Sequence, residues 1–491
     1  MLKITPLPAF KKYPRIVAFL LGALAVTGYA PFYFYPAAIL ALAGLFRLWQ
    51  QATNPRQVIL LGYSFGLGLY GAGVSWIYIS LHVFGGMPIL MAALATTTLC
   101  AFLALFPATA GWISTHFGKS KLYAMPVAWV LMEWVLNWIF TGFPWMTIGN
   151  SQVPYSPLAG FAPVFGVFGV SLAAAQVAAL VATWSEGTFR RPVLTALLLF
   201  WVSGSLLGRI EWSLPVGAPV SVSLLQGNIP QDMKWQPEEV ARTLTTYLDL
   251  AKKHPAQLVV LPETALPMLR NQLSEDYRQA LIKATGGDVL SGVVETENDH
   301  YYNSMVSLRE AKSQAYRKDH LVPFGEFIPF KSALGWIYQD LLNIPLTDLA
   351  SGGVHQRPLI LAGQKIGINI CYEDVFGEEI IRQLPEATLL INASNDAWFG
   401  TSLAAHQHLQ MSQTRALETG RMMLRATNTG ATAIINPHGD VVREAQHFTT
   451  TALTGMAQGY TGTTPYVRWG NWPVISLLFL TLGVLWMRKK K

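Results

Sequence analysis

The chain has few cysteines and few charged residues, and each shortage excludes a class of protein. Its 491 residues include only two cysteines, Cys100 and Cys371. Two cysteines exclude both a disulfide framework and a four-cysteine zinc site. Charged residues make up 13% of the chain and hydrophobic residues 52%, whereas an ordinary soluble domain is about 25% charged. The composition therefore excludes a disordered chain and a protein that is water-soluble throughout.

Acidic residues are especially scarce in the first part of the chain. Residues 1–218 contain three acids, Glu133, Glu186 and Glu211, against eleven lysines and arginines. The net charge of +7 comes from this part and from the basic tail at 488–491, because residues 219–487 hold more acids than bases. A nucleic-acid-binding protein needs basic residues clustered on a folded domain. The sequence has no such cluster, so nucleic acid is not an expected partner.

Long apolar runs account for the high hydrophobicity. Crossing the hydrocarbon core of a membrane takes about 20 apolar residues. Eight stretches approach or exceed this length, at 14–30, 32–49, 57–80, 87–115, 122–140, 158–184, 193–210 and 471–487. The first two are short and could instead form one helical hairpin. We predict a polytopic α-helical membrane bundle of about eight spans, seven of them in residues 1–211 and the eighth at 471–487.

The basic residues indicate how these spans are oriented. They precede the first span, lie in alternate loops and follow the last span, with Arg209 at a span end as the exception. The opposite loops, around 30, 81–86 and 141–157, contain no lysine or arginine. Because positively charged loops stay in the cytoplasm, both termini are predicted to be cytoplasmic. Seven crossings then place the segment 212–470 outside the cytoplasm.

The outer segment has a different pattern. Short β-rich runs bounded by turn signals occur at 220–226, 257–262, 288–294, 305–308, 365–371, 388–393 and 431–436, and helical patterns lie between them at 238–253 and 274–285. This mixture predicts a layered α/β domain over residues 219–460. The segment has no Gly-rich phosphate loop, and we expect no cofactor.

Two charged residues stand where acid–base chemistry is feasible. Glu263 directly follows the run at 257–262, and a carboxylate at a strand end can serve as a general base. Lys318 shares a short segment with Glu326, and a lysine near a thiol can stabilise an oxyanion. Each has an ordinary alternative, a surface or capping acid for Glu263 and a solvated lysine for Lys318. Neither residue decides the question alone.

Cys371 ends the run at 365–371 and leads into a polar turn. It is the only cysteine of the outer domain, and an unpaired thiol outside the cytoplasm is exposed to oxidation, which favours a functional role. A small buried core residue is the alternative, and it is the expected role of Cys100 inside an apolar run. The polar and aromatic segment 391–400 either shapes a pocket or forms an Asn/Asp turn.

The sequence leaves open the roles of three histidines and of one acid. His406, His408 and His438 show no metal-binding spacing, so no metal is expected, while a Cys–His dyad is left open. Glu133 lies inside the fifth span, where a lone acid is either functional or paired with a neighbour. Asn137, one helical turn further on, is the expected neighbour.

Glu263, Lys318 and Cys371, in the contexts 261–264, 317–326 and 371–374, resemble the Glu–Lys–Cys triad of the nitrilase (carbon–nitrogen hydrolase) superfamily. With the flanking spans, the whole chain resembles the membrane-embedded apolipoprotein N-acyltransferase family. The segments 143–145, 226–228, 234–235 and 392–398 add to this resemblance.

The resemblance implies an α-β-β-α sandwich domain carried by the bundle. It also implies transfer of a fatty acyl chain from a phospholipid, typically phosphatidylethanolamine, through a thioester on Cys371 to the N-terminal amine of S-diacylglyceryl-cysteine in apolipoproteins. Glu263 would be the base, and Lys318 with the backbone N–H of Tyr372 would stabilise the oxyanion. These roles place the protein in the bacterial inner membrane, and a monomer is expected.

The same resemblance assigns supporting roles. Glu326 and Glu373 would be supporting acids, and Tyr372 and Trp235 pocket or lid residues. The segments 230–236 and 325–350 would be gates for lipid entry, or else long surface loops. Two other functions stay open at this point: a membrane-tethered amidohydrolase that releases free acid, and a transporter or scaffold that only binds lipoproteins.

Overall fold

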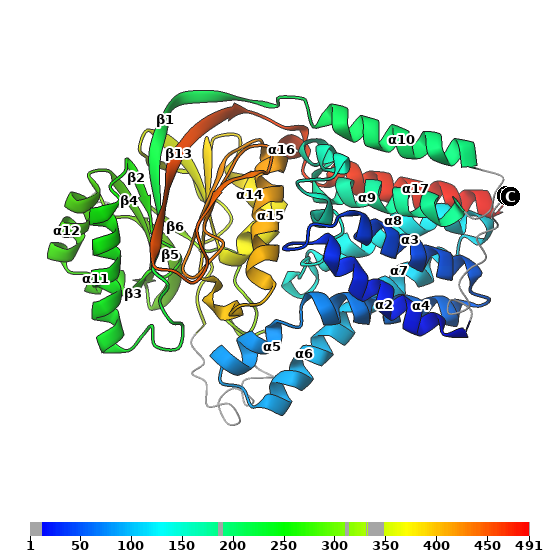
Figure 1. The fold of residues 1–491 in the computed structure, drawn as a ribbon, viewed down its shortest axis with the longest axis horizontal. Helices are drawn as coiled ribbons and strands as arrows, with labels where there is room; N and C mark the ends of the chain where they lie inside the picture. Colours follow the sequence, from blue (N-terminus) through cyan, green and yellow to red (C-terminus); the bar gives the residue numbers. More distant parts are fainter. Residues whose placement is uncertain (1–11, 185–189, 310–313, 330, 332–347, 491) are drawn as a thin grey trace. The chain divides into compact units, whose positions relative to one another are not determined.

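The computed structural model describes residues 12–184, 190–309, 314–329, 331 and 348–490. The chain divides into two compact units, which can be followed by colour in Figure 1. Unit 1 comprises Met1–His82, Pro88–Glu211 and Arg468–Lys491, and unit 2 comprises Val83–Met87 and Trp212–Val467. Most of the expected gate at 325–350 lies outside the described residues.

Unit 1 is built from apolar helices, and a helix lies in each of the eight apolar stretches of the sequence. They are α2 (Pro14–Ala25), α3 (Pro36–Gln51), α4 (Pro55–Gly73), α5 (Ile77–Ile79), α6 (Ile89–Leu103), α7 (Leu105–Thr115), α8 (Lys121–Leu136), α9 (Ala162–Thr183), α10 (Arg190–Leu207) and α17 (Trp472–Lys490). Prolines in the first turns of α2, α3 and α4 fit helix starts, where their missing N–H costs nothing.

Fewer helices pass a strict test for spanning a membrane. In the described part of the chain, three are long and apolar enough: Ile89–Thr115, Pro157–Thr183 and Trp472–Lys489. The expected span at 57–80 is broken, since Pro55–Gly73 and Ile77–Phe84 meet at an angle of 55°. The structure supports an apolar helical bundle, and the count of eight crossings stays a prediction.

Two glycines bring the backbones of α2 and α4 into contact. A Cβ atom at Gly22 would lie 2.0 Å from the carbonyl oxygen of Phe65, and one at Gly68 would lie 1.9 Å from that of Phe19. Small residues at such positions let helices approach closely in lipid, where association depends on van der Waals packing. The packing of α2 on α4 is therefore of the kind that membrane bundles use.

Glu133 on α8 has local partners other than the expected Asn137. Its Oε1 accepts hydrogen bonds from the indole N–H of Trp129 and from the amide N–H of Ile148, both at 2.8 Å. The carboxyl group thereby ties α8 to the segment that precedes α9. This arrangement favours a packing role for Glu133.

Unit 2 contains two β-sheets. The first has the strand order β13-β1-β2-β4-β5-β6, with β3 beside β4, and the second has the order β12-β11-β10-β9-β8-β7. The strands are β1 (Ser213–Gln226), β2 (Leu258–Val260), β3 (Leu266–Leu269), β4 (Asp288–Glu297), β5 (His300–Ser307), β6 (Ala315–Arg317), β7 (Leu359–Leu361), β8 (Gln364–Ile370), β9 (Leu389–Ser394), β10 (Met423–Thr427), β11 (Ala433–Ile435), β12 (Val441–Glu444) and β13 (Thr451–Gly462). Strands β1, β2 and β4 run parallel in the first sheet, as do β8, β9 and β10 in the second.

The two sheets face each other and helices cover their outer faces. A buried apolar cluster combines inward side chains of both sheets, among them Leu224, Val260, Ile368 and Ile391. The outer face of the first sheet packs on α11 and α12, and that of the second on α15 (Figure 1). These helices, with the short α14, are α11 (Pro237–Lys253), α12 (Glu275–Thr285), α14 (Gly377–Ile380) and α15 (Ala404–Thr419). Unit 2 is thus an α-β-β-α sandwich.

Six strands of the sandwich, β3, β6, β7, β10, β12 and β13, lie outside the predicted β-rich runs, and β10 and β13 show why. Strand β10 contains Arg425, which interrupts its apolar run, yet this arginine is fully buried and paired. Strand β13 is rich in glycine and threonine and is held by its antiparallel pairing with β1, from Ser213 opposite Gly462 to Gln226 opposite Thr451. The long strand β1 begins at Ser213 and its partner β13 ends at Gly462, so the sandwich extends past the predicted domain limits of 219 and 460.

Candidate active site

Polar residues from both sheets meet where parallel strands end. Glu263 follows β2, Cys371 follows β8 and Asn395 follows β9. The carboxyl ends of parallel strands lie at one edge of a sheet, the usual place for ligand sites in open α/β sheets. The amide N–H of Asn395 donates a 2.8 Å hydrogen bond to Glu263, and this contact joins the strand ends of the two sheets. We take this edge as the candidate active site.

Cys371 has an unusual backbone conformation. Its φ of 52° lies in the left-handed region, which residues other than glycine adopt only at an energetic cost. The carbonyl oxygen of Cys371 accepts a hydrogen bond from Asn392 Nδ2 at 3.1 Å and lies 3.1 Å from His408 Nε2. Such strain persists only where surrounding contacts enforce it, and these contacts hold the half-buried thiol in place.

The surroundings of Cys371 favour the protonated form of its thiol. Burial and then the negative charge of Glu263 raise its pKa well above the ordinary value, and the positive charge of Lys318 only partly opposes them. Because the thiolate is the reactive form of a cysteine, a nearby carboxylate that can accept the thiol proton is relevant to any chemistry at this residue. Glu263 is the carboxylate whose charge acts on it most strongly.

Glu263 is held in a fixed orientation. Its Oε1 accepts a 2.7 Å hydrogen bond from Asn303 Nδ2, and its Oε2 accepts the bond from Asn395. Lys318 Nζ lies 3.8 Å from Oε1. Each carboxylate oxygen thus has a fixed donor, so the side chain is positioned before any substrate binds.

The loop that carries Glu263 lies directly against β4. A Cβ atom at Gly292 of β4 would lie 2.3 Å from the amide nitrogen of Thr264 and 2.4 Å from the carbonyl oxygen of Pro262. Only glycine leaves room for this approach. Gly292 therefore contributes to the position of the carboxylate although it offers no functional group.

Lys318 is the buried cation of the site. Its Nζ lies 2.9 Å and 2.8 Å from the two carboxylate oxygens of Glu326, and its side chain is 1% exposed. Burial lowers the pKa of Lys318, but the carboxylates of Glu326 and Glu263 raise it more, so the pKa is above its ordinary value. The ammonium group therefore keeps its charge at neutral pH.

Asn303 connects Glu263 and Glu326, and the sequence did not predict it as a site residue. Its Nδ2 donates to Glu263 at 2.7 Å and to Glu326 at 3.0 Å. The residue reaches both because β5 pairs with β4, with Asn303 opposite Val294. The only signal available from the sequence is a polar amide within an apolar strand, which is too common to identify a site.

The residues expected to support the site differ in their burial. Glu373 is buried and accepts hydrogen bonds from Tyr316 Oη (3.0 Å), Asp319 N (2.7 Å) and Ile370 N (2.6 Å), which tie the end of β8 to the loop that carries Lys318. Tyr372 is buried and packs edge-on against His320 and Phe376. Trp235, by contrast, is 55% exposed.

Two family models match this chain, the first mainly within unit 1 and the second within unit 2. The model described as apolipoprotein N-acyltransferase N-terminal domain matches residues 21–180, and the one described as carbon-nitrogen hydrolase matches residues 221–466. An apolipoprotein N-acyltransferase of Nitrosomonas europaea is 52% identical over 96% of this chain and 95% of its own length. The chain belongs to the apolipoprotein N-acyltransferase family.

Other members are similar over nearly their whole length. The apolipoprotein N-acyltransferase of Methylococcus capsulatus is 44% identical over 96% of this chain and 95% of its own length. That of Neisseria meningitidis serogroup A is 38% identical, covering 98% and 97%. Among solved structures, the chain is similar to the CN-hydrolase superfamily protein XC1258 from Xanthomonas campestris, with 17% identity and a TM-score of 0.39 over 49% of this chain and 91% of that one.

This N-acyltransferase buries a charged cluster behind Cys371. Arg425 binds Asp374 at 3.1 Å and Asp396 at 2.8 Å, and His408 Nε2 lies 2.7 Å from Asp374. All four side chains are at most 1% exposed. His408 also contacts the carbonyl oxygen of Cys371. Since a buried charge without its partner is costly, the cluster fixes the backbone on which the thiol is carried.

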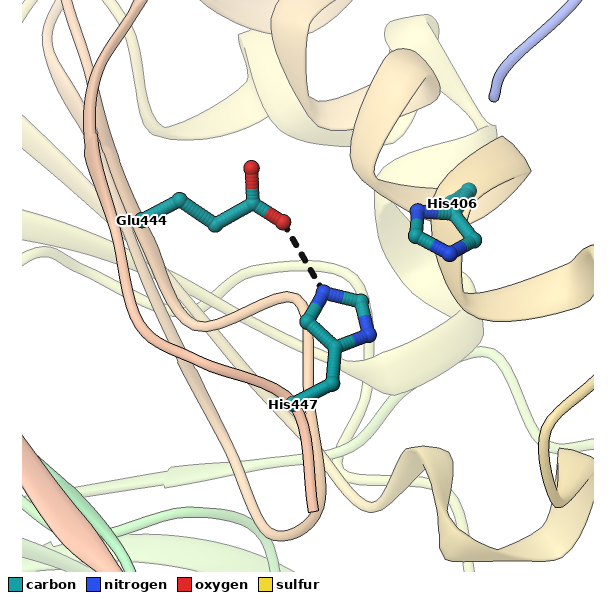
Figure 2. A group of neighbouring side chains, drawn as sticks. All are labelled: His406, Glu444 and His447. Carbon is teal, nitrogen blue, oxygen red and sulfur yellow. Dashed lines mark hydrogen bonds and ion pairs between the residues drawn. The ribbon is translucent and has the colours of Figure 1, made fainter. Parts of the chain in front are cut away.

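One other group of described side chains in the N-acyltransferase has metal-ligating chemistry. His406, Glu444 and His447 bring one ligand atom each within 4.8 Å of one another (Figure 2). His447 Nε2 lies 2.9 Å from Glu444, but it also accepts the amide N–H of Ala431 at 3.1 Å. A metal ion on this nitrogen would leave the buried Ala431 amide unpaired. We therefore assign the group no metal.

Replacing Lys318 with methionine is expected to destabilise the N-acyltransferase strongly. The change leaves the carboxylates of Glu263 and Glu326 close together without their shared cation, which costs about 3–5 kcal/mol for a buried pair. Thermal unfolding in detergent micelles measures the effect. The double variant Lys318→Met, Glu326→Gln serves as the control and should recover part of the loss, because one carboxylate charge is removed as well. A single variant as stable as the parent would contradict the ion-pair role.

Proposed function

We propose that this protein transfers a fatty acyl chain from a phospholipid to the N-terminal amine of S-diacylglyceryl-cysteine in apolipoproteins, through a thioester on Cys371. The observation that carries the proposal is the arrangement of Glu263, Lys318 and Cys371 at the strand ends of a carbon–nitrogen hydrolase domain. Membership of the apolipoprotein N-acyltransferase family supports the choice of acceptor.

In the first half of the reaction, Glu263 takes the proton of the Cys371 thiol. The sulfur attacks the ester carbonyl carbon of the phospholipid, and the oxyanion that forms is stabilised by the ammonium group of Lys318 and the backbone N–H of Tyr372. The carbon–oxygen bond to the glycerol then breaks. The departing oxygen takes the proton from Glu263, and a lysophospholipid leaves while the acyl chain stays on sulfur.

In the second half, the same carboxylate works on the acceptor. Glu263 removes a proton from the incoming amine, and the nitrogen attacks the thioester carbonyl carbon. The carbon–sulfur bond breaks, the amide is formed, and Glu263 returns the proton to the sulfur of Cys371. The two substrates thus use one site in turn, in a ping-pong cycle that needs no cofactor or metal.

The supporting residues are given roles that follow their contacts. Glu326 holds Lys318 in place through two short contacts. Glu373 fixes the turn that carries Tyr372, and the exposed Trp235 is a candidate lid residue. Each of these four is a positioning or pocket residue in the proposal, and none takes part in bond formation through its side chain.

We further propose a multi-pass protein of the bacterial cytoplasmic membrane. The bundle comprises residues 1–211 and 471–487 in eight spans, and the catalytic domain comprises 219–460 on the outer face, with both termini in the cytoplasm. Support comes from the helix in every apolar stretch and from the positions of the basic residues. The protein is proposed to act as a monomer.

Incubation with a phospholipid carrying a labelled acyl chain tests the proposal. We expect the label on Cys371 as a thioester that hydroxylamine removes, and its transfer to a diacylglyceryl-cysteine peptide when that peptide is added. An amidohydrolase with the same triad is the rival function. Hydrolysis of small amides to free acid, with no label on Cys371 and none on the peptide, would favour the rival and refute acyl transfer.

A further inference from the structure

The turn between β1 and α11 holds a second buried lysine near the site. Lys234 is 3% exposed, and in the described part of the chain its Nζ forms no ion pair with a carboxylate, unlike that of Lys318. Buried lysines are nearly always paired, because removing an ammonium group from water is costly. A cation in this state is a candidate binding group for an anion that the protein itself does not supply.

Contacts on the same turn place Lys234 beside the catalytic base. Gln231 Oε1 accepts a 2.5 Å hydrogen bond from Asn395 Nδ2, and the amide N–H of Asn395 binds Glu263. Ile229, at the start of the turn, is fixed by two hydrogen bonds with Asn428 (2.9 Å and 2.8 Å). The turn is therefore anchored to the strand ends that form the site.

The charge state of Lys234 fits such a role. Burial lowers the pKa of Lys234 to about 8, and the nearby carboxylate of Glu263 opposes this effect. The ammonium form thus still predominates at neutral pH. The other site lysine, Lys318, is already shared between Glu263 and Glu326. Of these two site lysines, Lys234 is the one without a protein anion in contact.

The proposed reaction brings an anion to this place. A phospholipid carries its phosphate on the same glycerol as the reacting ester, so the phosphate must lie within a few bonds of the carbonyl that Cys371 attacks. Lysine is a common ligand for phosphate, as a compact point charge. We propose that Lys234 binds the phosphate group of the phospholipid donor, an inference that rests on the proposed function.

The experiment compares two donors, one with an anionic phosphodiester headgroup and one with no phosphate. Phosphatidylglycerol and diacylglycerol with the same labelled acyl chains are presented in neutral detergent micelles, and formation of the Cys371 thioester is measured. For Lys234→Met we expect the KM for phosphatidylglycerol to rise about 10- to 100-fold, the size of a lost charge-assisted contact. The kcat should stay nearly unchanged, and so should both constants for diacylglycerol.

Two further variants make the comparison specific. Lys234→Arg keeps the charge and should retain most of the preference for the phospholipid. Lys252→Met removes an exposed lysine of α11 and should leave both donors unaffected. If Lys234→Met does not fold, as thermal unfolding would show, Lys234→Gln is used in its place, and the ratio between the two donors is the quantity compared.

Two results would overturn the inference. An equal loss with both donors would mean that Lys234 acts only through Glu263, and an unchanged KM for phosphatidylglycerol would mean that it does not bind the phosphate. Failure of the parent protein to form the thioester from any phospholipid would refute the proposed function instead. The two failures are therefore distinguishable.

Discussion

Replacing Cys371 with alanine is expected to lower acyl transfer by more than about 10³-fold, because a covalent route cannot proceed without its nucleophile. The variant should remain folded, since the side chain is small and its carbonyl contacts with Asn392 and His408 are made by the backbone. Transfer of a labelled acyl chain to a diacylglyceryl-cysteine peptide measures the loss. Thermal unfolding in the same detergent verifies the fold.

The second cysteine provides a matched control. Cys100 is buried in the helical unit, where its Sγ lies 3.5 Å from the carbonyl oxygen of Tyr70. Cys100→Ala should keep the full rate and the hydroxylamine-sensitive label on the remaining cysteine. Acyl transfer that survives in Cys371→Ala would refute the thioester mechanism, whereas a parent protein that binds the peptide without transferring any label would favour a binding or scaffold function.

Replacing Glu263 with glutamine is expected to slow acyl transfer and, at the same time, to make the thiol of Cys371 easier to ionise. The amide cannot accept the thiol proton, so acyl transfer should fall by about 10² to 10⁴-fold, the usual contribution of a general base. The thiol itself should become easier to ionise. Its pKa is raised by burial first and by the charge of Glu263 next, and the variant removes the second of these while Lys318 still lowers the pKa.

Alkylation of Cys371 with iodoacetamide as a function of pH measures this effect. The sign follows from the thiolate being the form that reacts: a lower pKa moves the midpoint of the alkylation curve to lower pH in Glu263→Gln. Glu326→Gln gives a control, because it removes a neighbouring carboxylate charge while Glu263 and Lys318 are both retained. A midpoint that moves to higher pH, or a rate of acyl transfer that does not fall, would exclude Glu263 as the base.

The parts of the site that follow directly from a strand could be predicted from the sequence. Glu263 and Cys371 come immediately after apolar runs, and the end of a parallel strand is a place that local sequence can indicate. Lys318 lies just after the short strand β6, which the sequence did not indicate as a strand; the segment that it shares with Glu326 made it a candidate, and its place in a triad came from the resemblance. The helices of unit 1 follow from hydrophobicity alone.

The remaining parts depend on contacts between distant segments. Asn303 acts on Glu263 and Glu326 only because two strands pair in one register. The donor from Asn395 is a backbone amide, which every residue type possesses. In the sequence, His408 is one polar residue of a helix and Arg425 is one polar residue of a strand. Only the fold brings both to Asp374, close to Cys371 in the chain. No local pattern carries such information.

The two residues proposed to exchange a proton belong to different sheets, because Glu263 follows β2 and Cys371 follows β8. Their separation is therefore set by how the inner faces of the sandwich fit together, through side chains such as Leu224 and Ile391 that lie far from any substrate. The packing of the apolar core thus sets the distance between the carboxylate of Glu263 and the thiol of Cys371. A cavity or an extra methyl group between the sheets is therefore expected to change the distance between the two side chains, and with it the rate of acyl transfer, in addition to lowering the stability of the domain.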